Sequence, residues 1–257
     1  GRVFNNMVAL YSTANATASI GISLDGTTRY INVYYNTVRL ETGTSAVTTS
    51  SFKTASNVSN VYVLNNIFSN YSKGYAYYVQ SASAQVSENY NNYFSNSTTR
   101  LAFYGAEKAT MADLRAASGG DVNSLNLEAY FVSENDPHLA IGNLATKAQY
   151  NADVPEDIDG TMRTPIPSPT IGAHEYVREV HDIAIVKIMS PTIDTRCVES
   201  DTIMVCVKFY NNGSSNETNV SWYAELQDVP GAISATRNFA TFPLGQEKID
   251  SVPLLLP

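Results

Sequence analysis

The chain has 257 residues, of which 44% are hydrophobic and only 16% are charged, so a packed core is feasible and wholesale disorder is disfavoured. Its net charge of −8 argues against nucleic acids and anionic lipids as partners, because both attract basic surfaces. The sequence contains no run of apolar residues long enough to predict a membrane span, and its first residues do not resemble a signal peptide.

An asparagine motif recurs through residues 1–105. In each copy an asparagine is followed by two mostly apolar residues, as in Asn66-Ile67-Phe68. The anchor positions stand 30, 30 and 26 residues apart: Asn6, Asn36, Asn66 and Asn92. Such a period is typical of stacked units that are each too small to bury their own apolar face. Because the chain begins inside the first copy, we expect it to be part of a longer protein.

Short β-rich runs alternate with turn-forming residues around these asparagines, and no long helical pattern separates them. The runs that lead into an asparagine are residues 31–33, 61–63 and 86–88. The runs that follow are residues 18–24, 45–49, 75–79 and 101–104. The pattern predicts an all-β fold in which two or three strands per repeat stack as the coils of a parallel β-helix.

Parallel stacking would place equivalent residues of successive coils above one another. We therefore expect the four anchor asparagines to form a hydrogen-bonded ladder along the axis, which satisfies polar groups at an inward turn. This structural role is favoured over a repeated catalytic group. The same reasoning predicts one apolar core column, formed by Val8, Val38, Phe68 and Phe94.

Residues 110–117 are predicted to form a short helix. Thr110 is a suitable N-cap, Asp113 lies near the positive end of the helix dipole, and Gly119-Gly120 ends the element. Because stacked repeats need covered ends, we expect this helix to cap the last coil.

The segment around and after this helix carries a specific resemblance. Its motifs, in chain order, are DLRAASGGDVNS at 113–124, FVS at 131–133, DPHL at 136–139, DIDGTMR at 157–163 and IGAHEY at 171–176. This order resembles the C-terminal closure of right-handed parallel β-helix proteins with a pectate-lyase-like fold, from the secreted and surface proteins of Bacteroidetes. The resemblance departs at residues 128–130 and 141–146. It implies a right-handed parallel β-helix with a short capping helix over residues 1–178.

Residues 181–257 follow a short charged linker and form a second strand-rich unit. Within it, residues 202–209 alternate between apolar and polar positions, and a turn is predicted at 211–213. The sequences VKFYNNG and PLGQEKIDSVP resemble the immunoglobulin-like, CARDB-type domains of bacterial surface proteins. An immunoglobulin-like sandwich needs about seven strands, so we expect this β-sandwich to be incomplete, with one or two closing strands missing.

The chain has two cysteines, Cys197 and Cys206. They fit either a disulfide of an extracellular protein or two separate small buried hydrophobic residues.

Residues that could carry catalysis are scarce. In the resembling enzymes, polysaccharide lyases use Ca²⁺-binding carboxylates with a basic residue, and hydrolases use clustered carboxylates. The acids of the repeats, Asp25, Glu41 and Glu88, neither pair nor recur at one coil position. The histidines stand far apart in the sequence, so no catalytic, cofactor-binding or metal-binding residue is nominated.

A calcium site is considered at one position only. Asp157-Ile158-Asp159-Gly160 offers clustered carboxylates, which hard cations prefer, but further ligands of a calcium loop are missing. The resemblance to the β-helix proteins instead implies a turn here, in which Asp159 and Arg163 are bridged.

Tyrosine is frequent, with 17 copies, and crowds the repeats. Because side chains alternate along a strand, about half of these rings should point outward, where they could stack on the apolar faces of sugars. The candidates for such stacking are Tyr35, Tyr62, Tyr75 and Tyr77. The competing interpretation is a ladder of like residues that stabilises the stack.

Three hypotheses about function follow. In the first, this is part of a secreted or cell-surface protein that binds a polysaccharide or serves adhesion, with upstream domains in the same chain and no catalytic site in this part. In the second, it is the non-catalytic end of a polysaccharide lyase or glycoside hydrolase whose active coils lie upstream. In the third, it is a structural stalk that ends in immunoglobulin-like modules.

Overall fold

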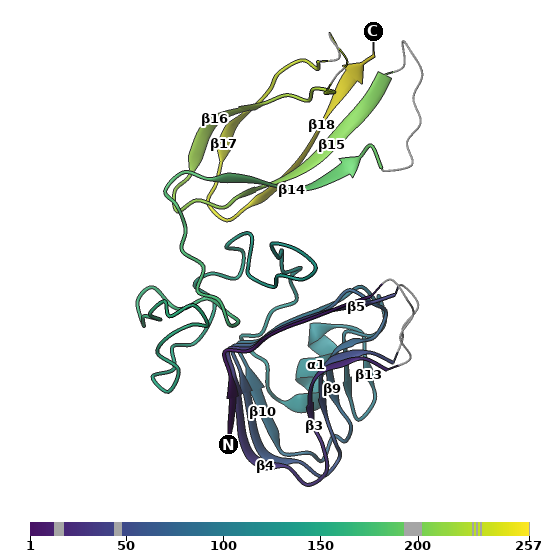
Figure 1. Cartoon of the computed structure of the whole chain (residues 1–257), viewed down its shortest axis with the longest axis vertical. Coiled ribbons are helices and arrows are strands. Elements are labelled where there is room, and N and C mark those ends of the chain that lie inside the picture. Colours follow the sequence, from purple (N-terminus) through teal and green to yellow (C-terminus); the bar gives the residue numbers. More distant parts are fainter. Residues whose placement is uncertain are drawn as a thin grey trace. The chain divides into compact units, whose positions relative to one another are not determined.

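The computed structural model describes residues 1–12, 18–43, 48–192, 202–227, 229, 231 and 233–256. Within this part the chain is all-β apart from one short helix, and it forms two compact units (Figure 1). Unit 1 comprises Gly1–Ala140 and Leu144–Tyr176, and unit 2 comprises Ile141–Asn143 and Val177–Pro257.

Three sheets build unit 1, and the chain visits them in turn, so that every third strand returns to the same sheet. The first sheet contains β1 (Arg2–Phe4), β4 (Arg29–Tyr34), β7 (Ser59–Leu64) and β10 (Val86–Asn89). The second contains β2 (Met7–Ser12), β5 (Thr37–Thr42), β8 (Ile67–Asn70) and β11 (Asn92–Ser95). The third contains β3 (Ile20–Leu24), β6 (Ser50–Thr54), β9 (Tyr75–Val79), β12 (Ala102–Tyr104) and the short β13 (Glu107–Lys108).

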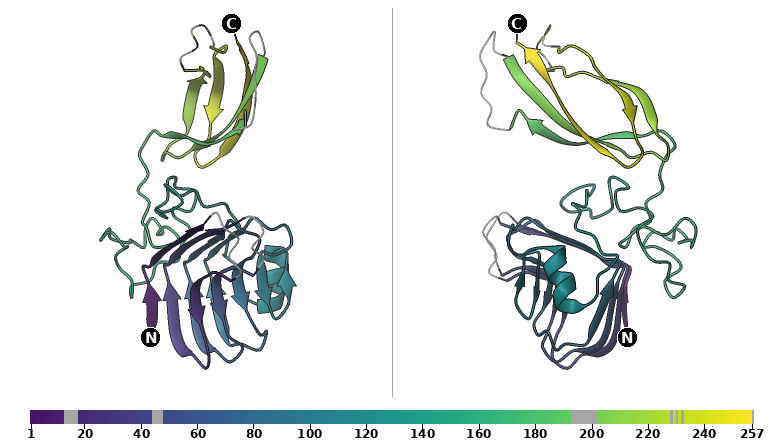
Figure 2. Two further views of the ribbon diagram at one scale, coloured as in Figure 1. Left: turned by 45° about the vertical axis from the view of Figure 1, so that its right-hand side comes forward. Right: turned by 180° about the vertical axis from the view of Figure 1, so that it is seen from behind.

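The strands within each sheet are parallel, except for β13, which pairs antiparallel with β12. Figure 2 shows them layered along one axis, with β1 at one end and the helix at the other. Most of the strand predicted at residues 45–49 lies outside the described residues, and the strand described in this coil is β6. Phe52 of β6 supplies the inward aromatic residue, in register with Ile22 and Tyr77.

Each corner between the first and second sheets has the same backbone geometry. The corner residues have positive φ angles of 52° to 62°: Asn5, Tyr35, Asn65 and Tyr90. A left-handed residue is uncommon outside glycine and redirects the chain sharply. The residue directly after each of them turns its side chain into the stack.

These inward residues form an asparagine ladder. The main-chain N–H of Asn36 and its Nδ2 both donate to Oδ1 of Asn66, each at 2.9 Å. Asn6 donates to Asn36 in the same way, and Asn66 donates to Asn91 at 2.9 and 3.0 Å. The fourth rung is therefore Asn91 and not Asn92, whose side chain instead bonds the main chain of Leu127.

The same shift of one residue changes the predicted apolar column. Val8 pairs with Val38, and Val38 with Phe68, but the partner of Phe68 in the last coil is Tyr93 rather than Phe94. The step to the last coil is thus one residue shorter than predicted.

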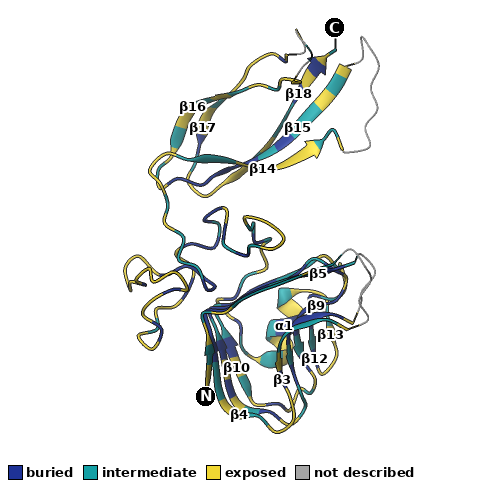
Figure 3. Ribbon diagram, in the orientation of Figure 1, coloured by how far each residue is buried: buried dark blue, intermediate teal, exposed yellow. Residues whose placement is uncertain are grey.

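The core of unit 1 contains a cluster of stacked aromatic rings. Ring centroids lie 5.1 Å apart for Phe52 and Phe68, and 5.0 Å apart for Tyr77 and Tyr93. All four side chains are fully buried, and such ring pairs add to the stabilisation from burial. Figure 3 shows how buried residues follow the strands of this unit.

The predicted helix is confirmed as α1 (Met111–Ser118). Its N-cap Thr110 and Asp113 form a reciprocal capping box, and Gly119 ends it in the left-handed conformation. Leu114 is fully buried against the aromatic core, so α1 covers the last coil.

A long irregular segment of unit 1, residues 144–176, is held by the corner residues. The Nδ2 of Asn5 donates to the carbonyl of Glu156 at 2.7 Å. The Tyr35 hydroxyl and the Asn65 amide both donate to the carbonyl of Gln149, at 2.6 and 2.8 Å. Three of the four corners thus bond this segment through their first residue and the asparagine ladder through their second.

Unit 2 consists of two small antiparallel sheets. One contains β14 (Ile183–Ser190), β15 (Thr202–Asn211) and β18 (Glu247–Leu255), and the other contains β16 (Glu217–Trp222) and β17 (Arg237–Phe242). Phe209 packs against Trp222 and Phe239, with ring centroids 5.1 and 5.5 Å apart. Cys206 lies half-buried in β15, and Cys197, with which it could form a disulfide, lies outside the described residues.

Candidate functional site

A cleft of about 430 Å³ lies on the outer face of the third sheet of unit 1. Its lining residues are Ala18, Thr48, Ser50, Lys53, Tyr75, Tyr78, Arg100 and Phe103. We call it the outer cleft. Its volume falls within the range of small-molecule sites, roughly 300–1,000 Å³.

Strand alternation explains why these side chains gather outside. Lys53, Tyr78 and Phe103 are in register on β6, β9 and β12, and their neighbours Phe52 and Tyr77 point into the core. Because successive side chains point to opposite faces of a sheet, the three form an outward column beside the inward aromatic column.

The outward column forms a continuous aromatic surface. The rings of Tyr78 and Phe103 stack with centroids 4.5 Å apart and an angle of 9° between their planes. The ring of Tyr75 stands edge-on to both, at 5.4 and 5.8 Å. Lys53 Nζ lies 5.6 Å from the centroid of Tyr78, within reach of a cation–π interaction.

Polar groups border one side of this surface. The carboxylate of Glu107 accepts hydrogen bonds from the Tyr75 hydroxyl and from Arg100 Nε, each at 2.9 Å. The Tyr75 hydroxyl and Arg100 lower the pKa of Glu107 and keep it ionised, and burial together with Glu107 raises the pKa of Tyr75. Within the described part of the chain, Lys53 forms no ion pair with a carboxylate.

The predicted sugar-stacking residues are distributed differently from the prediction. Tyr75 lines the outer cleft, and Tyr62 is 47% exposed on β7, away from it. Tyr35 and Tyr77 are fully buried, so the prediction that they stack on sugars is wrong. Tyr35 is a corner residue that bonds residues 144–176, and Tyr77 belongs to the core. The prediction missed Tyr78, the outward neighbour of Tyr77.

A cluster of acidic residues and histidines, drawn from residues 136–174, also escaped the sequence analysis. His138 Nδ1 lies 2.5 Å from Asp136 Oδ1, and its Nε2 lies 3.2 Å from Asp159 Oδ2. The ring of His174 meets that of His138 edge-on, with centroids 5.1 Å apart. The hydrogen bond to Asp136 raises the pKa of His138, whereas burial and then His138 lower the pKa of His174.

The calcium site considered at Asp157 and Asp159 is not supported by the geometry. Asp157 accepts three main-chain hydrogen bonds, from Asp159, Thr161 and Glu175, and so its oxygens shape the turn. The predicted bridge between Asp159 and Arg163 is also wrong, because Asp159 pairs with His138 instead.

Arg163 is instead a fully buried anchor of the irregular segment. It donates to the main-chain carbonyls of Glu156, Gly172 and Ala173. Its guanidinium lies 4.0 Å from the centroid of the Tyr35 ring. The carbonyl bonds and this cation–π contact compensate for burial of the charge.

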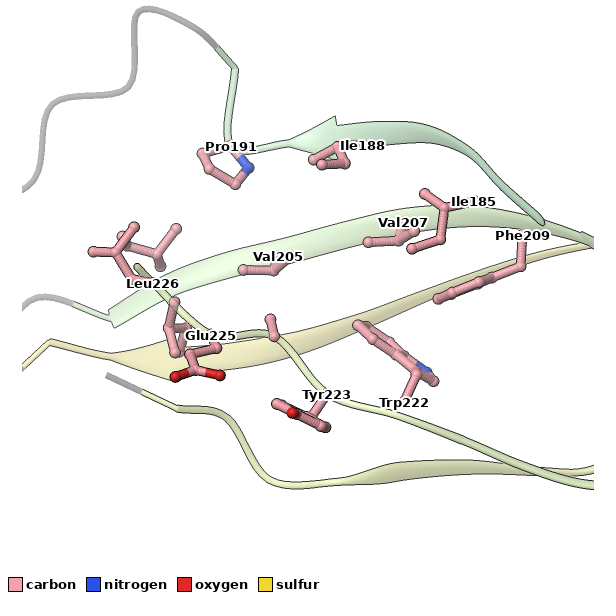
Figure 4. Close-up of a pocket in the computed structure, with 13 residues that line it drawn as sticks. Ile185, Ile188, Pro191, Val205, Val207, Phe209, Trp222, Tyr223, Glu225 and Leu226 are labelled. Atoms are coloured by element: carbon pink, nitrogen blue, oxygen red, sulfur yellow. The ribbon is translucent and has the colours of Figure 1, made fainter. Parts of the chain in front are cut away.

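Unit 2 contains an apolar cleft of about 480 Å³ between its two sheets (Figure 4). Val205, Val207 and Phe209 of β15 form one wall. Trp222 and Tyr223 lie opposite, and Ile185 and Ile188 border the opening. The few polar groups around it make this a gap in the sandwich rather than a site for a polar ligand.

No three histidine, cysteine or acidic side chains among the described residues gather closely enough to hold a metal ion. In the same part of the chain, no helix is long and apolar enough to cross a membrane. No protein-family model, no curated protein and no solved structure matches the chain.

Proposed function

We propose that this chain belongs to a secreted or cell-surface protein and binds polysaccharide through the outer cleft of unit 1. The observation that carries the proposal is the stacked pair Tyr78 and Phe103, bordered by Lys53 and Arg100 in one cleft. Aromatic rings pack against the apolar faces of pyranose rings, while cations and hydroxyls bond sugar oxygens. Arg100 is already paired with Glu107, so the ammonium of Lys53 is the charge in the cleft that favours sugars with carboxylates.

The fold proposal accompanies the functional one. Unit 1 is a right-handed parallel β-helix of the pectate-lyase-like type, and unit 2 is an immunoglobulin-like, CARDB-type sandwich. Support comes from three parallel sheets visited in turn, from the asparagine ladder and from the covering helix α1. Parallel strands joined through a crossover take the right-handed path almost without exception.

A binding measurement tests the function. The native chain is screened on a polysaccharide array with neutral and uronate-containing polymers, and hits are quantified by calorimetry. Tyr78→Ala should weaken binding roughly tenfold or more, because the stacked surface is lost. Tyr30→Ala, which removes a ring that is 70% exposed on β4, is the control and should bind normally.

Lys53 tests the preferred class of sugar. Lys53→Ala should weaken binding of uronate polymers more than binding of neutral ones, and Lys53→Arg should retain most of the affinity. Absence of binding to every polymer on the array would refute the proposal, as would unchanged affinity of a folded Tyr78→Ala variant.

A further inference from the structure

A glutamate occupies a core position in the last coil. Val3, Val33 and Val63 form an inward column on β1, β4 and β7, and the next residue in register is Glu88 of β10. Glu88 is only 4% exposed. A carboxylate at an apolar position is costly unless a partner compensates for it.

Four oxygen atoms near this position have no hydrogen-bond partner among the described residues. They are both carboxylate oxygens of Glu88, Oδ2 of Asp121 and the hydroxyl oxygen of Tyr77. Asp121 and Tyr77 are fully buried. Buried polar groups in folded proteins nearly always have partners, so a set of four points to a missing ligand. We call these four atoms the oxygen cluster.

Glu88 and the start of the capping segment meet just after the C-terminal end of α1. The main-chain N–H of Asp121 donates to the carbonyl of Glu88 at 2.9 Å. A Cβ on Gly120 would lie 3.3 Å from Cγ of Glu88, so the glycine leaves room for that side chain. Burial raises the pKa of Tyr77 well above its usual value, and the neighbouring Glu88 and Asp121 carboxylates raise it further.

The other Asp121 oxygen is already fixed. Its Oδ1 accepts hydrogen bonds from the hydroxyls of Tyr93 and Ser124. This orients the carboxylate and leaves Oδ2 without a partner. The hydroxyl oxygen of Tyr77 adds a neutral ligand atom to the two carboxylates of the cluster.

Little positive charge compensates for the two carboxylates. Arg115 of α1 lies close enough to favour the ionised form of Asp121, but its guanidinium donates to the main-chain oxygens of Asp121 and Ser124. The C-terminal end of α1 adds a partial negative charge beside Gly120. The Ser118 hydroxyl favours ionised Glu88, although it makes no hydrogen bond of standard geometry with it.

We propose that the oxygen cluster of Tyr77, Glu88 and Asp121 binds a Ca²⁺ ion that joins the last coil to the capping segment. Ca²⁺ prefers oxygen ligands, accepts main-chain carbonyls and water in addition to carboxylates, and tolerates irregular geometry. Its charge of +2 matches the two carboxylates, and oxygens that have no hydrogen-bond partner are available as its ligands.

A proton competes with the ion at low pH. Burial disfavours the ionised form of both carboxylates, whereas Ca²⁺ binds them only when they are ionised. Ca²⁺ binding therefore releases protons, and affinity increases with pH. The titratable or charged groups around Glu88 are Asp121, Tyr77, Tyr93, Tyr104 and Arg115.

Thermal unfolding of the whole chain at pH 8.5 and pH 5 provides the test. At pH 8.5, CaCl₂ at about 100 times its dissociation constant should raise the Tm of unit 1 by roughly 5–10 °C. NaCl at equal ionic strength should have little effect, and MgCl₂ a smaller one, because Mg²⁺ demands stricter geometry. At pH 5 the rise should largely disappear.

Variants separate this site from surface binding. Glu88→Gln keeps the size of the side chain but removes its charge, and it should abolish the Ca²⁺-dependent rise. Glu134→Gln, which removes an exposed carboxylate, should retain it. If Glu88→Gln does not fold, tyrosine-sensitised Tb³⁺ emission of the native chain, displaced by CaCl₂ and lost at pH 5, supplies the readout. The proposal is overturned by an unchanged native Tm and no such emission, or by a full Ca²⁺ response in folded Glu88→Gln.

Discussion

The asparagine ladder should be essential for the stability of unit 1, and Asn66 is the rung that tests it most directly. Its side chain is fully buried and takes part in five hydrogen bonds. Nδ2 donates to the carbonyls of Val33 and Leu64 and to Oδ1 of Asn91, at 2.9 to 3.0 Å. Oδ1 accepts from both nitrogens of Asn36.

Asn66→Ala removes all five bonds at once. A buried polar group left without a partner costs about 1–3 kcal/mol. If the Asn36 N–H and one of the three acceptors become wholly unpaired, the loss is roughly 2–6 kcal/mol. Asn66→Asp keeps the oxygen that accepts from Asn36, but it replaces Nδ2 with a carboxylate oxygen that faces three oxygen acceptors. At pH 7 this variant should therefore lower the unfolding free energy at least as much as Asn66→Ala does.

Urea unfolding measures the effect. Near-ultraviolet circular dichroism of the tyrosines follows unit 1, while fluorescence of Trp222, the only tryptophan in the chain, reports on unit 2. The matched control is Asn135→Ala at an exposed position, which should change the unfolding free energy by less than about 0.5 kcal/mol. A loss below about 1 kcal/mol for both Asn66 variants would show that the ladder does not hold the coils together.

Three further predictions concern other parts of unit 1. In an NMR titration, His138 should have a pKa above the usual 6.5 and His174 a pKa below it. Protonated His138 gains its partner Asp136 on folding, which stabilises the folded state slightly. This stabilisation should be lost as the pH rises through the folded-state pKa of His138. Thr110→Ala should cost about 1 kcal/mol of α1 stability in chemical denaturation, whereas Thr110→Ser should keep the cap. Gly172→Ala should reduce the Tm more than Gly160→Ala, because both have positive φ but only the Cβ at 172 meets neighbouring side chains, at 2.6 and 2.7 Å.

The sequence contained enough information to locate the last rung, but matching the pair Asn91-Asn92 with the pair Asn65-Asn66 led to the wrong residue. In the two coils before it, the rung stands five residues after a valine or isoleucine of the preceding strand, as for Ile31 and Asn36. The same count from Val86 gives Asn91, whereas matching one asparagine pair with another gives Asn92. The left-handed corner residue of the last coil is Tyr90, so Tyr90-Asn91 is equivalent to Tyr35-Asn36 of the second coil.

Which tyrosines face outward could not be read from the sequence. Tyr77 and Tyr78 are adjacent, so alternation predicts that one of them is outside without indicating which. The register of β6 with β9 decides, because Phe52 and Tyr77 share the inward column. Tyr35 lies at a corner rather than within a strand, where the alternation rule does not apply.

The cluster around His138 was unpredictable for a different reason. It lies in an irregular segment without period, and its members are brought together by main-chain turns and by contacts with distant coils. Asp136 and His138 are two residues apart, but Asp159 and His174 follow much later in the chain. No local pattern records such an approach.

The position of the outer cleft on strands rather than loops bears on how it would bind. Tyr78 and Phe103 have their backbones fixed by parallel pairing, and their inward neighbours are locked in the core. Ordering flexible side chains on association costs about 0.5–1.5 kcal/mol each. A stacked pair already held at 4.5 Å avoids most of that cost. Unit 1 therefore uses one structural device, register between coils, both to build its core and to preorganise the surface proposed to bind sugar.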